Sequence, residues 1–163
     1  DLSKGKYLGD IENSSSIDMC IGVGSYPENH SFSNDFDKEI RLLKEKIDAG
    51  AEYAVTQMCF DNKKYFDFVD RCRKKGITIP IIPGIKILDK PKQLETLEKM
   101  FHITIPYELR NEALENIEYI DEIGTKWAIK QSEELINAGV PIIHYYLMND
   151  TSCMLKILNH LHQ

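Results

Sequence analysis

The regular alternation of short apolar segments with amphipathic segments constrains the fold of this chain more than any other feature. Segments 19–25, 53–59, 78–83 and 141–147 have the composition of buried strands, and helical periodicity follows each of them. Continuous apolar strands between amphipathic helices are typical of a parallel sheet covered by helices. The sequence therefore predicts an α/β fold made of four consecutive βα units.

The helical pattern is clearest in segment 35–49, where apolar residues recur three and four positions apart. Asn34 is its expected N-cap and Gly50 its expected C-terminal stop. Further helices are expected at 62–75, from Pro91 to about residue 100, after Pro106, at 122–138 and at 151–161. In segment 122–138, the residues expected to face the core are Ile123, Trp127, Leu135 and Ile136.

Two architectures fit four successive βα units: an open doubly wound sheet and part of a (β/α)8 barrel. A dinucleotide-binding sheet requires G-x-G-x-x-G after its first strand. Here the run is GVGSYP, so Pro27 occupies the position of the third glycine. A proline ring there blocks the close packing of helix on strand, which disfavours the dinucleotide-binding fold.

Composition argues against several functional classes. With 20 basic and 26 acidic residues, the formal net charge of −6 disfavours nucleic-acid binding, which needs a basic face. No apolar run approaches the roughly 20 residues of a membrane span, and the first residues lack a signal peptide. The four cysteines have no zinc spacing, so we expect no metal and free thiols in a reducing cytoplasm. Because the chain begins with Asp1, we expect a piece of a longer protein.

Ligands of parallel α/β proteins meet the carboxyl ends of the strands. The side chains expected there offer hydrogen bonds and aromatic rings but no nucleophile with an adjacent base. Such a set suits the orientation of a planar, polar ligand or cofactor. The residues are Tyr26, Glu28 and His30, then Thr56, Gln57 and Asp61, then Gly84 and Lys86, and finally Tyr146 and Asn149.

The residues alone leave alternatives open at several of these positions. The Gln57 amide lies among apolar neighbours and needs a partner, which is either a ligand or a neighbouring backbone group. His30 also fits an ordinary surface loop, and Lys46 fits a solvated helix face. Tyr145 and Tyr146 must point to opposite faces of the sheet, so one of them faces the helices.

Five segments of the chain resemble the methylenetetrahydrofolate reductase family, in family order. They are 22–30 (GVGSYPENH), 43–50 (LKEKIDAG), 54–61 (AVTQMCFD), 79–85 (IPIIPGI) and 144–149 (HYYLMN). The resemblance implies a (β/α)8 TIM barrel, which needs about 250 residues. It identifies residues 1–163 as a partial catalytic domain, the C-terminal half-barrel with the last four βα units.

The resemblance also implies an activity and its ligands. The family is a cytoplasmic oxidoreductase of one-carbon metabolism and methionine biosynthesis. It reduces 5,10-methylenetetrahydrofolate to 5-methyltetrahydrofolate with FAD and NAD(P)H, and a homo-oligomer is expected. By resemblance, Tyr26, His30, Glu39 and Lys46 contact FAD, and Gln57, Gln93 and Tyr146 contact the folate. No catalytic residue can be matched, because the family's acid lies in the earlier strands.

Two departures from the family pattern affect the folate site. Asp150 stands where the family commonly has an arginine, and an aspartate would repel the anionic glutamate tail of folate. Leu97 stands where some members have a phenylalanine that stacks on the ligand. These departures keep two alternatives open: an inactive folate- or flavin-binding half-barrel, and a subunit that needs a separately encoded first half.

Overall fold

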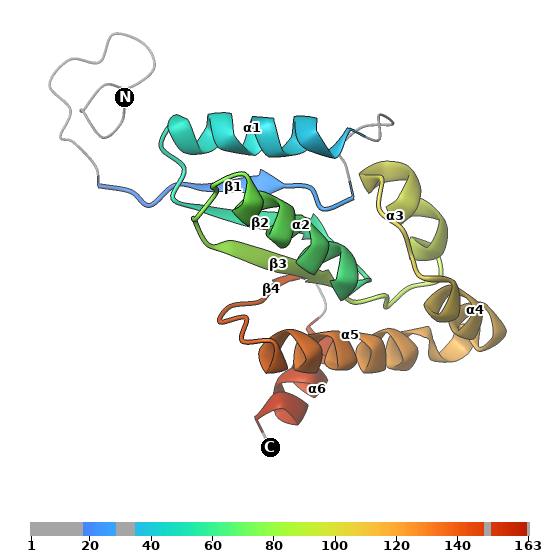
Figure 1. Ribbon diagram of the computed structural model, residues 1–163. Coiled ribbons are helices and arrows are strands. Elements are labelled where there is room, and N and C mark those ends of the chain that lie inside the picture. The colour runs from blue at the N-terminus through green and yellow to red at the C-terminus, as the bar shows by residue number, and fades with distance from the viewer. Residues whose placement is uncertain (1–17, 29–34, 149–150, 163) are drawn as a thin grey trace, which may run out of the picture.

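The computed structural model describes residues 18–28, 35–148 and 151–162. One parallel sheet runs through it, with its strands in the order in which they occur along the chain (Figure 1). The sheet consists of β1 (Gly22–Ser25), β2 (Tyr53–Met58), β3 (Ile81–Lys86) and β4 (His144–Tyr146). The predicted α/β class and the four βα units are confirmed, and an open parallel sheet of this kind is consistent with half of a barrel.

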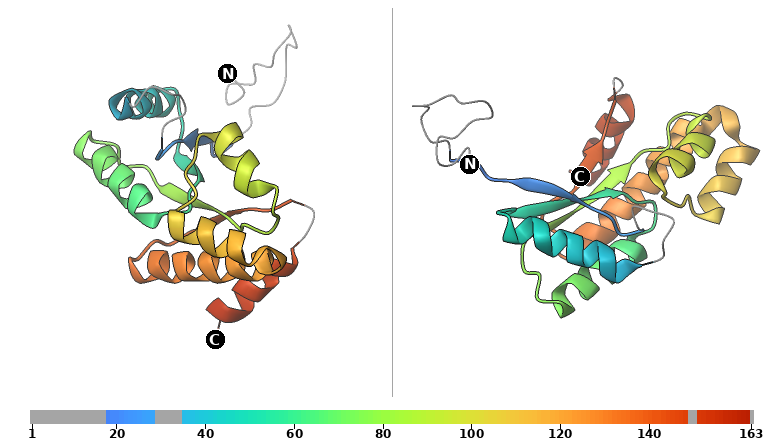
Figure 2. Two further views of the ribbon diagram at one scale, coloured as in Figure 1. Left: turned by 90° about the vertical axis from the view of Figure 1, so that its right-hand side faces the viewer. Right: turned by 90° about the horizontal axis from the view of Figure 1, so that it is seen from above.

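Helices occupy every connection between strands and also follow the last strand (Figure 2). Among the described residues, a single helix follows each of β1, β2 and β4, whereas three helices and a short 3-10 turn (Ile117–Tyr119) separate β3 from β4. The helices are α1 (Phe36–Asp48), α2 (Asn62–Lys74), α3 (Gln93–Phe101), α4 (Tyr107–Glu115), α5 (Ile120–Asn137) and α6 (Ser152–Leu161). Among the described residues, none of these helices is long and apolar enough to cross a membrane.

Two apolar clusters stabilise this arrangement. In the larger one, Leu43 of α1, Phe68 of α2 and Leu135 of α5 pack with residues of β2 and β3. The second lies at the carboxyl end of the sheet, where Phe60 and Leu88 pack with residues of α3, α4 and the start of α5. Each buried side chain of this size stabilises the fold by about 1.5–3 kcal/mol. The second cluster therefore fixes α3 and α4 beside the strand ends that carry the predicted site.

The strand boundaries differ from the predicted ones. The third strand was expected at 78–83 but runs from Ile81 to Lys86. Its last three residues pair with all of β4, a long-range contact that apolar periodicity does not report. The first and fourth strands are shorter than predicted, because only 22–25 and 144–146 find a partner in the sheet.

The helix termini are governed by local hydrogen bonds. Asp35 caps α1, with Lys38 N donating to Asp35 Oδ1 at 3.0 Å, so the prediction of Asn34 as the cap is wrong. The asparagine side chain is one residue too early for a helix that begins at Phe36. Gly50 follows the helix with a φ of 112°, which confirms the predicted stop. Ile136 is 49% exposed, so its predicted place in the core is also wrong.

Two glycines allow backbones to approach closely. A Cβ on Gly84 of β3 would lie 2.5 Å from the Thr56 carbonyl oxygen and 2.6 Å from the Tyr146 ring. A Cβ on Gly124 of α5 would lie 1.9 Å from the carbonyl oxygen of Leu88. Both sites exclude any side chain, so these glycines set the distance of β4 and of α5 from the middle of the sheet.

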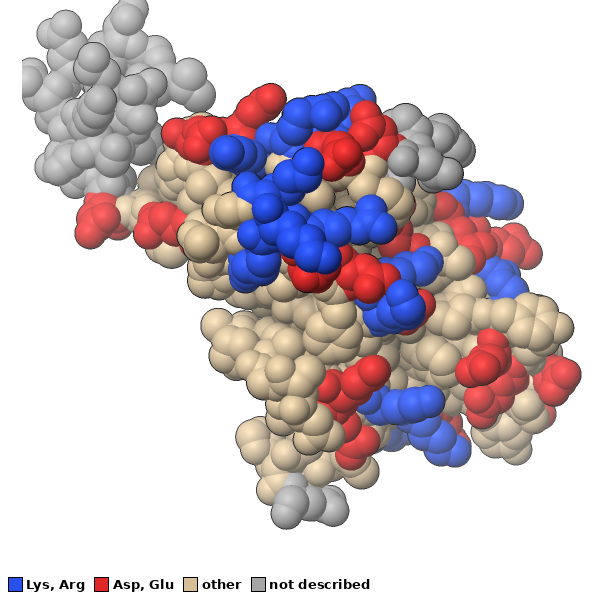
Figure 3. All heavy atoms as spheres, viewed as in Figure 1, with Lys and Arg blue, Asp and Glu red and all other residues tan. Residues whose placement is uncertain are grey.

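Basic side chains are not spread evenly over the surface. Lys and Arg gather over α1 and α2 in the view of Figure 3, although the chain as a whole is acidic. Several of them are paired with aspartates of the same two helices or of the α1 cap: Arg41 with Asp35, Lys74 with Asp70 and Lys75 with Asp37. Exposed pairs of this kind stabilise a protein by at most about 1 kcal/mol each.

Candidate functional site

The carboxyl ends of β1 and β2 bring together two residues that the sequence singled out. Tyr26 follows β1, and Gln57 is the second-to-last residue of β2. Both line one small hollow together with Phe101 and His102 at the end of α3, and this hollow is too small to hold even a water molecule. A phenol and an amide at neighbouring strand ends can still contact the face and the edge of a flat ligand that lies over them.

Lys46 reaches back to the same region from the last turn of α1. Its Nζ donates a 2.8 Å hydrogen bond to the carbonyl oxygen of Gly24 and lies 5.7 Å from the centroid of the Tyr26 ring. A cation and an aromatic ring held side by side are chemically suited to an anionic group attached to a planar one. Glu39, on the same helix, is buried, with only 7% of its surface exposed.

The oxygen of the Gln57 side-chain amide has a hydrogen-bond partner within the chain. This Oε1 accepts a 2.9 Å hydrogen bond from the backbone N–H of Met58. This bond falls where the pairing of β2 with β3 shifts register, between Val55 and Met58. Within the described part of the chain the Gln57 Nε2 has no hydrogen-bond partner, so the donor half of the amide remains available to a ligand.

Tyr146 and Tyr145 point to opposite faces of the sheet, as predicted. The Tyr145 hydroxyl lies 2.6 Å from Ser132 Oγ of α5, so this ring faces the helices. The Tyr146 hydroxyl donates a 2.9 Å hydrogen bond to the Thr56 carbonyl oxygen. Burial raises the pKa of Tyr146, and the neighbouring Tyr26 raises it further. The phenol that follows the first strand therefore acts on the phenol at the end of the last strand.

Gln93 organises the loop after β3. Its Oε1 accepts hydrogen bonds from Asp89 N at 2.9 Å and Lys90 N at 3.3 Å, while its Nε2 donates to Asp89 Oδ1 at 2.5 Å. The same Asp89 oxygen lies 3.6 Å from Nζ of Lys86, a lysine with only 8% of its side chain exposed. The Gln93 side chain thus closes the turn that leads into α3. Its contact with folate stays a prediction.

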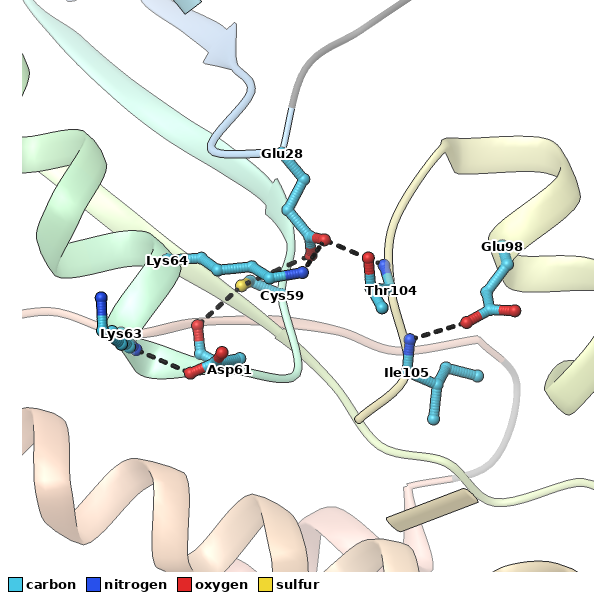
Figure 4. Close-up of polar contacts among 8 residues, drawn as sticks. All are labelled: Glu28, Cys59, Asp61, Lys63, Lys64, Glu98, Thr104 and Ile105. Atoms are coloured by element: carbon cyan, nitrogen blue, oxygen red, sulfur yellow. Dashed lines mark hydrogen bonds and ion pairs between the residues drawn. The ribbon is translucent and has the colours of Figure 1, made fainter. Parts of the chain in front are cut away.

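A buried carboxylate that the sequence placed at the carboxyl end of the first strand joins three segments (Figure 4). Glu28 forms an ion pair with Lys64 of α2, and its Oε2 accepts a 3.0 Å hydrogen bond from Thr104 N between α3 and α4. Its Oε1 lies 3.8 Å from Cys59 Sγ. The carboxylate, 8% exposed, holds the loop that carries Tyr26 against α2 and the α3–α4 connection. Nothing in the sequence links Glu28 to Thr104, which lies 76 residues further along the chain.

The same surroundings control the chemistry of Cys59. Burial, and then the negative charge of Glu28, raise the pKa of this thiol to about 12. The thiol donates a 3.0 Å hydrogen bond to the Asp61 carbonyl oxygen, which favours its protonated form, and the positive charge of Lys64 lowers the pKa only partly. At neutral pH the thiol is protonated, so Cys59 is a structural group and not a nucleophile.

Some predicted residues do not contribute to this picture. His30, Asn149 and Asp150 lie outside the described residues. Leu97 is buried in the second apolar cluster, where it packs between helices. Among the residues that the structure describes, no group of three or more His, Cys, Asp and Glu side chains could hold a metal ion.

A family profile and two curated relatives that match this chain carry the name of one family. The sequence profile of the family described as methylenetetrahydrofolate reductase matches residues 8–162. Methylenetetrahydrofolate reductase 1 of Schizosaccharomyces pombe is 33% identical over 147 residues, which are 88% of this chain and 24% of that protein. The 5,10-methylenetetrahydrofolate reductase of Buchnera aphidicola subsp. Schizaphis graminum is 36% identical over 143 residues, 86% of this chain and 49% of that protein.

A solved structure from Clostridium thermocellum shares the fold with a TM-score of 0.57 and 22% identity. The match covers 86% of this chain and 52% of that one. That protein is described as binding two copies of 5-methyl-5,6,7,8-tetrahydrofolic acid. This chain spans about half the length of the bacterial relative and about a quarter of the yeast one. Because the profile covers nearly all of its sequence, the chain belongs to the methylenetetrahydrofolate reductase family.

Proposed function

We propose that the protein containing this chain reduces 5,10-methylenetetrahydrofolate to 5-methyltetrahydrofolate, with FAD as cofactor and NAD(P)H as hydride source. The observation that supports this most is that Tyr26 and Gln57 lie at the neighbouring carboxyl ends of β1 and β2, with Lys46 of α1 beside the Tyr26 ring. In this proposal, residues 1–163 form the C-terminal half of a catalytic barrel and supply part of the flavin site and part of the folate site.

The flavin side of the site consists of Tyr26, His30, Glu39 and Lys46. The fit to a dinucleotide rests on Lys46 and Tyr26, because an ammonium group beside a phenol ring suits a phosphate attached to a planar group. When bound, FAD supplies the acceptor that takes a hydride and passes it on. Lys46 attracts and orients the anionic portion, and the Tyr26 ring covers one side of the ligand.

The folate side consists of Gln57, Gln93 and Tyr146. The free Nε2 of Gln57 donates a hydrogen bond to the pterin, while its Oε1 stays on Met58 N. That backbone bond fixes the rotamer, so the donor is oriented before the substrate arrives. Tyr146 lines the site with its hydroxyl anchored on Thr56, and Gln93 holds the loop that leads to α3.

The acid that opens the methylene bridge has no candidate among these residues. Glu28 is engaged by Lys64, Thr104 and Cys59, so its carboxylate has no free side from which to protonate a substrate. We therefore assign the proton donor to a part of the protein outside the described residues. The burial of Cys59, Cys72 and Cys153 as free thiols supports a reducing, cytoplasmic location, and a homo-oligomer is proposed with it.

A second candidate is a protein that binds folate without reducing it. The engagement of Glu28 by Lys64 and Thr104 favours this reading, because it leaves no candidate acid among the described residues. The two candidates differ in a single observable, because only the reductase reoxidises a reduced flavin when methylenetetrahydrofolate is added.

The test is Gln57→Ala in the complete protein, with the two half-reactions measured separately. We expect flavin reduction by NAD(P)H to be nearly unchanged and folate-dependent reoxidation to fall about 10- to 100-fold, since one hydrogen bond to the pterin is lost. Asn116→Ala, which removes an exposed amide after α4, is the control. Equal losses in both half-reactions would remove Gln57 from the folate site.

A further inference from the structure

A second pocket lies between the start of α2, the start of α4 and the middle of α5. Its volume is about 420 Å³, and it shares no residue with the predicted flavin and folate contacts. Three aromatic side chains line it: Phe60, Tyr107 and Trp127. Three carboxylates, Asp61, Glu108 and Glu134, stand around the same space, with Lys130 as the single basic residue of the lining.

A buried acceptor without a partner belongs to this lining. Gln131 is 4% exposed, and its Nε2 donates to Cys59 O at 3.2 Å and to Asn62 Oδ1 at 3.1 Å. Both partners are acceptors, so the amide must present its NH2 group to them. The orientation of Asn62 is equally fixed, because its Nδ2 donates to Gln131 O and to Glu134 Oε2. Gln131 Oε1 is thereby left with no hydrogen-bond partner among the described residues.

An unsatisfied buried carbonyl oxygen is costly unless a donor approaches it. Gln131 Oε1 has almost no accessible surface, so an N–H donor in the pocket reaches it only when the lining side chains shift slightly. The pocket's three carboxylates against one lysine favour a positive charge on that donor group. The aromatic rings favour the same charge, and Lys130 Nζ already lies 5.6 Å from the centroid of the Trp127 ring. The Lys130 ammonium group thus occupies the position beside the Trp127 ring that an incoming cation would take. It therefore competes with such a cation at the rim of the pocket.

We propose that this pocket binds an alkylammonium or alkylguanidinium group, with its N–H donors on the carboxylates and, after a small shift of the lining side chains, on Gln131 Oε1, and with its carbon chain against Tyr107 and Trp127. Such a group is carried by a free small amine or by a lysine or arginine side chain of another protein. The site is separate from the proposed reductase chemistry, so neither depends on the other.

The probe set varies charge at nearly constant size: n-butylammonium, n-butanol and butyrate. Trp127 is the single tryptophan of the chain, so its fluorescence reports on the pocket directly. We expect a saturable change with n-butylammonium and n-propylguanidinium, and no saturation with the neutral or anionic probe in the same concentration range. Equal responses to the three charge types, or no saturable response to either cation, would overturn the proposal.

Substitutions at two exposed positions test whether binding depends on charge, and they should change the affinity for n-butylammonium in opposite directions. Glu108→Gln removes one carboxylate and should weaken n-butylammonium binding about two- to fivefold. Lys130→Met removes the competing cation and should tighten binding by a similar factor of about two to five. Glu115→Gln, the same charge change at the far end of α4, is the matched control and should leave binding unchanged. A loss with Glu115→Gln equal to that with Glu108→Gln would show a general charge effect and contradict the site.

Peptide titrations distinguish the two sources of the cation, a free small amine and a side chain of another protein. A pentapeptide with blocked ends and a central lysine or arginine is titrated beside the free amines, with an alanine peptide as control. Tighter binding of a basic peptide than of the free amine assigns the pocket to a side chain of another protein. Binding of the free amine alone assigns it to a small molecule, and binding of the alanine peptide as tight as that of the basic ones would refute charge recognition.

Discussion

Thr56 of β2 is hydrogen-bonded to both β3 and β4. Its side-chain oxygen accepts a 2.9 Å hydrogen bond from Gly84 N, and its carbonyl oxygen accepts the hydroxyl of Tyr146. The space between these groups is closed, because Gly84 has no room for a side chain. The position of the Tyr146 ring, on the proposed folate side of the site, therefore depends on Gly84 in the adjacent strand β3.

Gly84→Ala should destabilise the fold by about 1–3 kcal/mol, because the new methyl group overlaps the Thr56 carbonyl oxygen and the Tyr146 ring. Urea unfolding monitored by circular dichroism measures this loss. Gly24→Ala is the control, since its Cβ would meet only the Tyr26 hydroxyl at an ordinary 3.7 Å. Similar stabilities for the two variants would show that the crowding at Gly84 is relieved without cost.

The cysteines should differ sharply in reactivity. With a pKa of about 12, Cys59 is ionised in only about one molecule in ten thousand at pH 8, and it is also buried. Cys20 is exposed and should be the thiol that a disulfide reagent modifies in the native protein. Counting labelled cysteines by mass spectrometry before and after unfolding tests this, and rapid native labelling of Cys59 would contradict its assignment as a structural group.

At the residue scale, the sequence predicts which side chains lie at the strand ends but not which distant residues they contact. Tyr26, Gln57 and Tyr146 were identified because they follow apolar strands, whose carboxyl ends must meet at one edge. Glu28 was placed at the end of the first strand, but its contacts were not predicted, because its partners Lys64 and Thr104 are distant in the chain and belong to elements whose relative placement no local pattern encodes.

Among the elements, α5 is the helix whose position is most narrowly defined. Gly124 lets its first turns touch the backbone at Leu88, directly after β3. Ser132 Oγ contacts the Tyr145 hydroxyl, and Trp127 Nε1 donates a 2.9 Å hydrogen bond to Phe60 O. The helix is thus joined to the segments after β2 and β3 and to β4, so a displacement of α5 would disturb several strand ends together.

The sign of the stability change caused by Gly124→Ala tests whether α5 packs directly against the segment after β3. In an unconstrained helix, the change stabilises by about 1 kcal/mol through helix propensity. Here we expect a net loss of about 2 kcal/mol or more, because the methyl group would overlap the Leu88 carbonyl group. Thermal and urea unfolding give the sign directly, and a stabilised variant would show that α5 does not rest on the β3 loop.

The connection between α3 and α4 depends on the Glu28 carboxylate. Glu28→Gln keeps the size of the side chain but removes the charge that Lys64 and Thr104 N share. We expect a loss of about 1–2 kcal/mol, moderated by the partial exposure of Lys64. Glu95→Gln on the exposed face of α3 is the control, and equal urea midpoints for the two variants would contradict this role of Glu28.

The elements themselves were largely predictable, whereas their ends were not. The spacing of apolar residues marks α1 and α2 because one face of each helix must be buried. It misplaced the third strand, since β3 extends to Lys86 only through pairing with β4, which lies about sixty residues further on. Caps such as Asp35 depend on which of two adjacent polar residues precedes the first helical turn.

At the scale of the whole molecule, the sheet has two edges. In the described part of the chain, β1 pairs only with β2, and β4 pairs only with β3. Apolar side chains near these edges are exposed, among them Ile21 before β1 and Met148 after β4. Unpaired strand edges with apolar neighbours are sites of association with other chains. This geometry agrees with the proposal that a first half-barrel completes the sheet.

The 163-residue chain by itself should therefore self-associate as its concentration rises. Leu155 and Leu158 of α6, the helix after edge strand β4, are exposed, and replacing both with lysine should weaken the association. Leu114→Lys on α4 is the control, because that exposed leucine is remote in sequence from both edge strands. Sedimentation velocity over a range of concentrations measures the effect, and a monomer at all concentrations would contradict it.

The central claim is that the carboxyl end of the sheet binds a folate. The most direct measurement is a nuclear magnetic resonance titration of the isotope-labelled complete protein with 5-methyltetrahydrofolate. The account predicts that the Gln57 side-chain amide and the backbone signals of Tyr26 and Tyr146 shift together, while those around Gln131 stay unchanged. Shifts confined to other parts of the chain, or none at saturating folate, would contradict it.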